Sequence, residues 1–102
     1  MKFNNIREII NAIKSKELSP REVTEYYLNR ISEHNHKFNA FITILGDEAV
    51  KRAKEAESEI LNGVYKGPLH GIPYAAKDII NTAGTRTTNG SALYKDYIPE
   101  YD

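Results

Sequence analysis

The sequence predicts an α/β fold with three amphipathic helices and two β-strands, in the order helix, helix, strand, helix, strand. Two observations carry this prediction. Apolar residues recur every three or four positions in three segments, as they do on one face of a helix, and two shorter segments are rich in residues typical of strands. At 102 residues the chain forms at most one small domain, so we expect a modest core.

The first two predicted helices are specified by an apolar stripe and by a capping signal. The first runs from about residue 4 to residue 16, and its stripe consists of isoleucines at helical spacing, Ile6, Ile9, Ile10 and Ile13. The second begins after Ser19, the expected N-cap, with Pro20 at the first helical position and Glu22 completing a capping box. The polar run SEHNHK is expected to end it, and we expect the two helices to pack together.

The remaining elements are two strands, a third helix and a loop. The segment FNAFITIL, residues 38–45, predicts a strand because it is rich in β-branched and aromatic residues. An alanine-rich stripe predicts a helix over residues 47–61, and Asn62-Gly63 supplies its stop. The segment IPYAAKDI, residues 72–79, predicts the second strand. The run NTAGTRTTNGS predicts a loop with a turn at Asn89-Gly90, and a short helical turn is expected before Pro99.

Charge and composition exclude several classes of protein. Fourteen basic residues balance fourteen acidic ones, so we expect no direct binding to nucleic acid. The chain contains no cysteine, which excludes disulfides, thiolate metal sites and thiol nucleophiles. No stretch resembles a signal peptide or approaches membrane-spanning length. We therefore expect a soluble cytoplasmic protein that does not bind membranes.

Lys77 is the unusual residue of the second predicted strand, because it lies in a segment otherwise suited to burial. Alternation along a strand places Lys77 and Asp78 on opposite faces, so the two side chains do not pair directly. In a water-poor site the uncharged form of a lysine is favoured, and a neutral amine can act as a general base. Alternatively, the stem packs while the charged head reaches water, which is the commoner arrangement of a lysine.

Other chemically capable residues give weaker signals. His34 and His36 are two positions apart, so on a helix they point in different directions and form no complete metal site. His70 precedes a glycine in a turn, where a structural role is commoner than catalysis. Arg86 lies in a polar loop and gives a weak signal for carboxylate or phosphate binding. No serine lies in a nucleophile elbow and no glycine pattern forms a phosphate cradle, so we predict no metal and no cofactor.

The segment GPLHGIPYAAKDIINTAGTRTTNGS, followed by YIPEYD, resembles the amidase signature family. That family reads broadly G-P-L-H-G-[IV]-P-x-x-x-K-D, then A-G-T-x-T-T-x-G-S, and ends in P-x-x-D. The earlier segments SPREVTEYYLNRISEHNHKFNAFIT and AVKRAKEAESEILNG are similar to the preceding helices and strand of the same family. The resemblance thus extends over nearly the whole chain.

This resemblance implies a catalytic role for Lys77. Members of the family cleave or transfer from carboxamide bonds with a Ser-cisSer-Lys triad, on a large α/β fold with a mixed central sheet. Lys77 falls on the motif lysine, the base that acts through the bridging serine. The Gly/Ser-rich signature that contains both serines has no counterpart here. The resemblance therefore implies that residues 1–102 are a partial amidase domain, an N-terminal fragment with helices packed on part of a mixed β-sheet, inactive alone.

Four interpretations remain open from the sequence. The chain is the N-terminal part of a general amidase that acts on a small amide substrate in the full-length parent. Alternatively, it belongs to the A subunit of a tRNA-dependent amidotransferase, which releases ammonia from glutamine and works with partner subunits. The third interpretation is a non-catalytic remnant that acts as an interaction module, and the fourth is a decayed gene product with no present function. The loop TTNGSALYKDYIP resembles general amidases slightly more than the amidotransferases.

Overall fold

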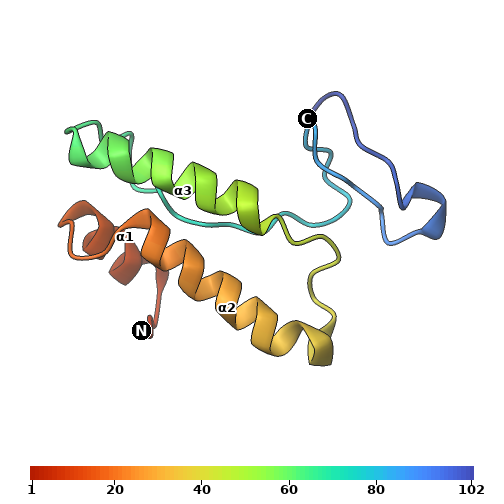
Figure 1. The fold of residues 1–102 in the computed structure, drawn as a ribbon, viewed down its shortest axis with the longest axis horizontal. Coiled ribbons are helices and arrows are strands. Elements are labelled where there is room, and N and C mark those ends of the chain that lie inside the picture. Colours follow the sequence, from red (N-terminus) through yellow and green to blue (C-terminus); the bar gives the residue numbers. More distant parts are fainter. The chain divides into compact units, whose positions relative to one another are not determined.

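The computed structural model describes all 102 residues and is helical in its regular structure (Figure 1). Its elements, in chain order, are α1 (Ile6–Lys14), α2 (Pro20–Phe38), α3 (Gly46–Leu61) and the 3-10 helix η1 (Ala92–Tyr94). None of the helices combines the length with the apolar composition that a membrane span needs. The three long helices match the three predicted ones, and η1 matches the short helical turn expected before Pro99.

The chain divides into two compact units, which we name by their content. The helical unit consists of Met1–Phe38 and Leu45–Pro73 and contains all three α-helices. The loop unit consists of Asn39–Ile44 and Tyr74–Asp102 and contains η1 as its one helical element.

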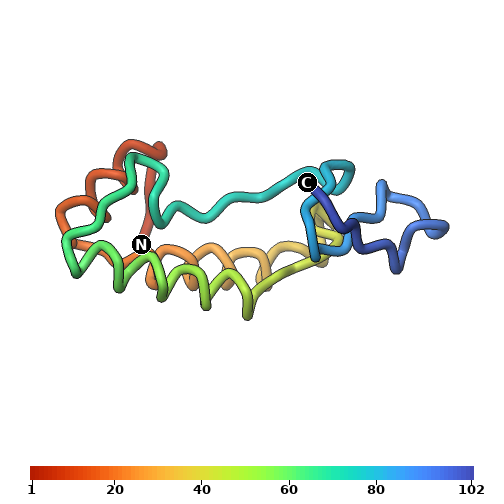
Figure 2. Tube along the Cα trace, turned by 90° about the horizontal axis from the view of Figure 1, so that it is seen from above, coloured from red at the N-terminus to blue at the C-terminus, as the bar shows by residue number.

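The core of the helical unit is small and apolar. In Figures 1 and 2, α2 and α3 lie side by side and run in opposite directions. The four buried aliphatic residues of the core come from all three helices, Ile9, Ile13, Val23 and Ile60. Partly buried side chains close the core around them, namely Phe3, Leu18, Tyr27, Tyr65 and Ile72. Two isoleucines of the predicted α1 stripe, Ile9 and Ile13, thus share a core with Val23 of α2, whereas Ile6 is exposed.

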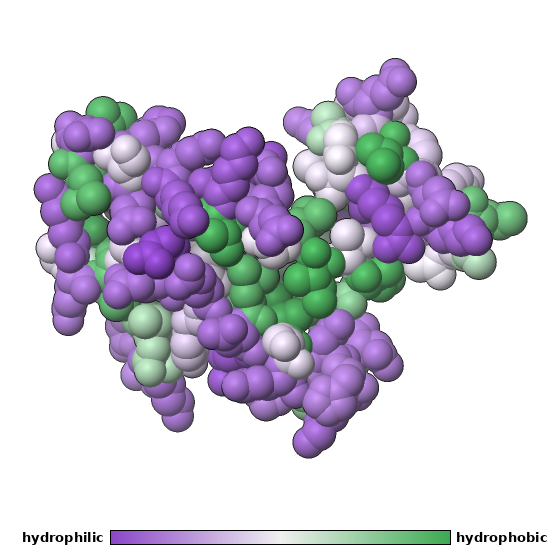
Figure 3. Space-filling view, in the orientation of Figure 1, coloured by the Kyte–Doolittle hydropathy of each residue, from purple (hydrophilic) through white to green (hydrophobic).

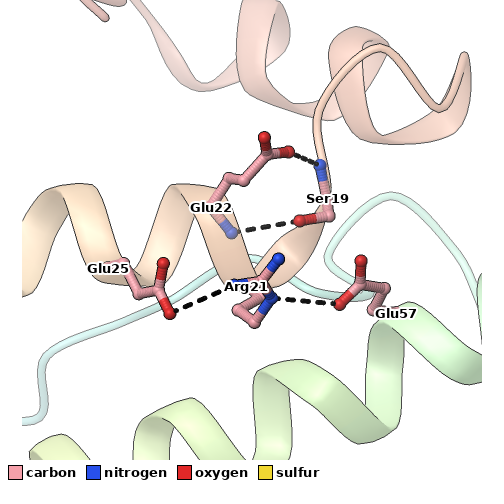
Figure 4. Close-up of polar contacts among 5 residues, drawn as sticks. All are labelled: Ser19, Arg21, Glu22, Glu25 and Glu57. Atoms are coloured by element: carbon pink, nitrogen blue, oxygen red, sulfur yellow. Dashed lines mark hydrogen bonds and ion pairs between the residues drawn. The ribbon is translucent and has the colours of Figure 1, made fainter.

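The start of α2 confirms the predicted capping box (Figure 4). The Glu22 main-chain N–H donates to Ser19 Oγ at 3.1 Å, and the Ser19 main-chain N–H donates to Glu22 Oε2 at 2.8 Å. These two bonds satisfy donors that a helix start otherwise leaves free. The bond from the Ser19 backbone also lowers the pKa of the Glu22 carboxyl. Arg21, the residue directly before Glu22, forms two ion pairs. Its Nη1 lies 3.5 Å from Glu25 Oε1 on the same helix, and its Nε lies 3.6 Å from Glu57 Oε2 on α3.

The two predicted strands are absent. The polar run at residues 32–37 forms the end of α2, as predicted, but the helix also takes in Phe38, and the rest of the first predicted strand has no regular structure. Residues 72–77 carry no strand either, and the only β-bridge in the chain is an isolated one between Thr82 and Thr85. A strand exists only when a neighbour pairs with its main chain, and neither segment has such a neighbour among these 102 residues. The mixed β-sheet expected from the resemblance is therefore not observed.

The loop unit has almost no apolar core. Its buried residues are two threonines and a proline, Thr87, Thr88 and Pro99. Its large apolar side chains are exposed instead, among them Ile42, Ile79, Ile80, Leu93 and Ile98. Figure 3 shows hydrophobic surface at the η1 end of this unit. The unit is held together by main-chain and polar contacts.

Gly71 is the point at which the GPLHGIP segment packs against α2. Its φ is +84°, and a Cβ built there would lie 2.6 Å from Pro20 Cγ. We expect Gly71→Ala to lower the free energy of unfolding of the helical unit by about 2 to 3 kcal/mol, because it adds a clash to an unfavourable φ. Urea unfolding followed by far-UV circular dichroism measures this loss.

Gly63→Ala is the matched control for Gly71→Ala. Gly63 has a similar φ of +85°, but a Cβ there has no atom within 4 Å. This variant should therefore lower the free energy of unfolding by about 1 kcal/mol, because only the unfavourable φ contributes. Equal losses in the two variants would show that the contact between Gly71 and Pro20 contributes nothing.

Candidate active site around Lys77

The GPLHG segment forms two overlapping turns. The His70 N–H donates to the Gly67 carbonyl at 3.0 Å, and the Ile72 N–H donates to the Leu69 carbonyl at 3.1 Å. Gly67 has a φ of +135°, a conformation in which a side chain is strongly unfavourable. The motif therefore has a structural role here. It connects α3 to Ile72, which packs against the core of the helical unit.

His70 is part of this scaffold. Its Nδ1 accepts the Lys66 main-chain N–H at 3.1 Å, and its Nε2 lies 3.0 Å from Glu59 Oε2. The Lys66 Nζ lies 2.7 Å from the same carboxylate oxygen, and this hydrogen bond lowers the pKa of Glu59. Both imidazole nitrogens are engaged and the side chain is only 9% exposed. This supports the structural role predicted for His70 over a role as a base.

Lys77 lies in the loop unit, in an extended segment that precedes a turn. The side chain is exposed, in contrast to the apolar, strand-embedded position that the sequence suggested. Its ammonium makes no ion pair and no hydrogen bond within the chain. The main chain, however, is fixed, because the Lys77 carbonyl accepts the Ile80 N–H at 3.0 Å. Lys77 therefore combines an anchored backbone with a free amine.

Asp78 anchors the same segment more strongly. Its Oδ1 accepts the Thr88 main-chain N–H at 2.9 Å, and its Oδ2 accepts the Thr88 hydroxyl. The Asp78 carbonyl accepts the Asn89 N–H at 2.8 Å. The Thr88 hydroxyl is the main reason that the pKa of Asp78 lies below its usual range, so the carboxylate is ionised at neutral pH.

The loop that receives Asp78 is a tight turn. Asn89 and Gly90 both have positive φ, +54° and +68°, and the Ser91 N–H donates to the Thr88 carbonyl at 2.9 Å. Positive φ at both central positions is what a type I′ turn requires, and Asn-Gly is its preferred sequence. This confirms the turn predicted at these residues.

Arg86 ties the loop to two other segments of the unit. Its Nη1 donates to Thr43 Oγ1 at 2.8 Å, and its Nε donates to the Lys95 carbonyl. The guanidinium is thus engaged in holding the loop unit together, and the weak signal for an anion site at Arg86 is better explained by this structural role.

The histidines of α2 do not converge on a metal site. His34 lies beside Glu33, with 3.7 Å between His34 Nε2 and Glu33 Oε2, and His36 lies in the last turn of the helix. No group of three or more His, Cys, Asp or Glu side chains in the chain is placed to hold a metal ion.

The contact between Asp78 and Thr88 was not predicted. The two residues are ten positions apart in irregular structure, where no periodicity relates them. The available signal was chemical. Asp78 supplies a carboxylate acceptor, and the threonines before the Asn89-Gly90 turn supply hydroxyl and main-chain donors.

Comparison with known sequences identifies the family. The sequence model described as "Amidase" matches residues 22–102, which include Lys77, Asp78 and Thr88. The chain belongs to the amidase family. Among the curated proteins, this amidase chain is 45% identical over 97 residues to the A subunit of the glutamyl-tRNA(Gln) amidotransferase of Thermoanaerobacter pseudethanolicus. It is 41% identical over 100 residues to the protein of the same name from Carboxydothermus hydrogenoformans, and 40% over 99 residues to that from Methylobacillus flagellatus.

These matches cover 95% to 98% of the amidase chain but only 20% to 21% of each relative. The chain therefore spans about a fifth of the length of the curated relatives it matches.

Proposed function

We propose that this amidase chain supplies the general base of an amide-cleaving enzyme, and that Lys77 Nζ is that base. The nucleophilic serine and the bridging serine that the family resemblance implies are contributed by amidase sequence outside residues 1–102, and the matched segment is only about a fifth of each relative. Residues 1–102 thus act as one part of an amidase domain, and the serine-containing part completes the active site.

The observation that carries this proposal is the free amine of Lys77 on an anchored backbone. Lys77 falls on the lysine of the family motif and lies within the segment matched to the amidase model. Its carbonyl and the adjacent Asp78 are held by hydrogen bonds, whereas its ammonium has no partner in the chain. Exposed lysines are commonly unpaired, so the position of Lys77 in the family motif is what distinguishes it. An unpaired lysine on a fixed segment is available to a group supplied from elsewhere.

The chemistry follows from the position of the proton. In these 102 residues Lys77 is exposed, so the proposal requires the serine-containing part to enclose it, because removal from water favours the uncharged amine. That amine takes a proton through the bridging serine from the nucleophilic serine, whose oxygen then attacks the carboxamide carbonyl. The tetrahedral intermediate collapses, the C–N bond breaks, and the proton returns from Lys77 to the leaving nitrogen, which departs as ammonia. Water then cleaves the acyl-serine ester, and Lys77 accepts and returns a proton in the same way.

The amide donor that we propose is glutamine. The three relatives described above carry the name of an amidotransferase, which favours this interpretation over the general amidase suggested by the loop at residues 87–99. Other amidotransferase subunits are then the expected partners. Turnover of simple aliphatic amides at a rate equal to or above that of glutamine would favour the general amidase instead.

A chimera tests the proposed function. Residues 1–102 replace the matched fifth of the Thermoanaerobacter pseudethanolicus protein, and ammonia release from glutamine is measured with the other subunits of that amidotransferase present. We expect kcat/KM within about tenfold of the unmodified protein, because the anchored Lys77 segment is retained. A folded, assembled chimera with no ammonia release would contradict the proposal and would favour the interaction module.

A further inference from the structure

We propose that Asp78 and Thr88 form a clasp that positions Lys77 for catalysis, so that Thr88 is a positioning residue of the reaction although it does not touch the reacting atoms. This inference rests on the proposed function of Lys77. It adds a residue from the TTNGS loop, to which neither the family motif nor the triad assigns a role.

The clasp holds Asp78, the residue next to the base, by three hydrogen bonds. The Asp78 carboxylate accepts two bonds from Thr88, one from the main chain at 2.9 Å and one from the hydroxyl. The Asp78 carbonyl accepts a third bond from Asn89 at 2.8 Å. The Ile80 N–H closes a turn on the Lys77 carbonyl at 3.0 Å, and Asp78 is the second residue of that turn. Holding Asp78 therefore also restrains the main chain of Lys77 beside it.

Thr88 is itself rigidly held. Its side chain is 3% exposed, and its hydroxyl accepts the Gly90 N–H at 3.2 Å while it donates to Asp78. The neighbouring Thr87 N–H donates to the Tyr97 carbonyl at 2.9 Å, which connects the loop to the chain after η1. Arg86 bonds the same loop to Thr43 and to the Lys95 carbonyl. Hydrogen bonds from Thr87 and Arg86, the two residues before Thr88, thus connect the clasp to other segments of the loop unit.

This rigidity matters because proton transfer depends on distance and direction. A general base must lie within hydrogen-bond reach of its partner, and a misplacement of about 1 Å costs on the order of a hundredfold in rate. Lys77 has a long, flexible side chain, so its main chain must be fixed for the amine to be delivered to one place. The turn bond from the Ile80 N–H to the Lys77 carbonyl holds one side of this residue, and the clasp holds the residue that follows it.

The test uses Thr88→Val in the chimera described above. Valine keeps the shape of threonine but removes both the hydroxyl bond to Asp78 and the acceptor of the Gly90 N–H, while the bond from the Thr88 main chain to Asp78 remains. We expect kcat for ammonia release to fall about 10- to 100-fold with KM for glutamine within about threefold, since the substrate contacts are unchanged. Thr88→Ser, which keeps the hydroxyl, should recover most of the rate.

Thr87→Val is the matched control. Thr87 is also buried, at 2% exposed, and its hydroxyl donates to the Thr85 carbonyl at 3.1 Å without touching Asp78. We expect its kcat within about threefold of the parent chimera. An equal loss in both valine variants would overturn the clasp, because the effect would then come from general disturbance of the loop.

A double variant separates this inference from the proposed function. In a Lys77→Ala background, Thr88→Val should produce no further loss, because Thr88 acts only through Lys77. A multiplicative loss in the double variant would overturn the positioning role while leaving Lys77 as the base. Substantial activity of Lys77→Ala alone would overturn the proposed function itself.

Discussion

Replacing Lys77 with alanine is expected to lower kcat/KM for ammonia release by about a thousandfold or more in the assembled chimera. General base catalysis by a positioned side chain contributes on the order of 10² to 10⁴ in rate, and Lys77 is the residue that falls on the family's base. His70, the histidine of the same motif segment, is engaged on both nitrogens by Lys66 and Glu59. Ammonia release under saturating and limiting glutamine measures the loss in kcat and in kcat/KM.

Lys77→Arg is the control that distinguishes a base from a positive charge. Arginine keeps the charge but does not lose its proton at accessible pH, so it should restore almost none of the activity. The far-UV circular dichroism and melting temperature should match the parent, because the Lys77 side chain is exposed and has no partner in the chain. Activity of Lys77→Ala or Lys77→Arg within tenfold of the parent would contradict the assignment.

Replacing Ile13 with alanine is expected to produce the largest loss of stability in the helical unit. Ile13 is 1% exposed and lies in the core with Ile9, Val23 and Ile60. Truncation of a buried isoleucine to alanine costs about 2 to 5 kcal/mol, because it removes apolar contacts and leaves a cavity. The core has few members, so this loss is a large part of the stability of a small domain. Urea unfolding of the 102-residue chain, followed by far-UV circular dichroism, measures it.

Ile6→Ala is the matched control on the same helix. Ile6 belongs to the same stripe of the sequence but is 51% exposed, so its truncation should cost well under half as much as that of Ile13. Both changes have the same effect on intrinsic helix propensity. Equal losses at the two positions would show that α1 does not pack as described.

The helices were predictable because their signals are local. The isoleucine stripe of α1 and the Ser19 to Glu22 capping box lie within a few residues of each other, and both recur in the structure. The strands were predicted from equally local signals, β-branched and aromatic residues in short runs. A strand, however, also requires a neighbouring strand, and the sequence of a single segment does not say whether that neighbour is present.

The candidate site was predictable in its key residue and not in its surroundings. Lys77 was identified from its place in a segment otherwise suited to burial and from the family motif. Its anchoring by Asp78 and Thr88 joins residues ten positions apart in irregular structure, and such contacts depend on the path of the whole loop. Arg86 is the reverse case, because its charge suggested a ligand site and its hydrogen bonds serve the loop instead.

The pH dependence of kcat/KM for ammonia release by the chimera tests the central claim most directly, that an uncharged Lys77 amine is the base. We expect the rate to fall about tenfold for each pH unit on the acid side, since only the uncharged amine accepts a proton. His70→Gln should leave the position of this acid limb unchanged, because His70 serves the scaffold. A rate that does not depend on pH, or an acid limb that disappears in His70→Gln, would contradict the account.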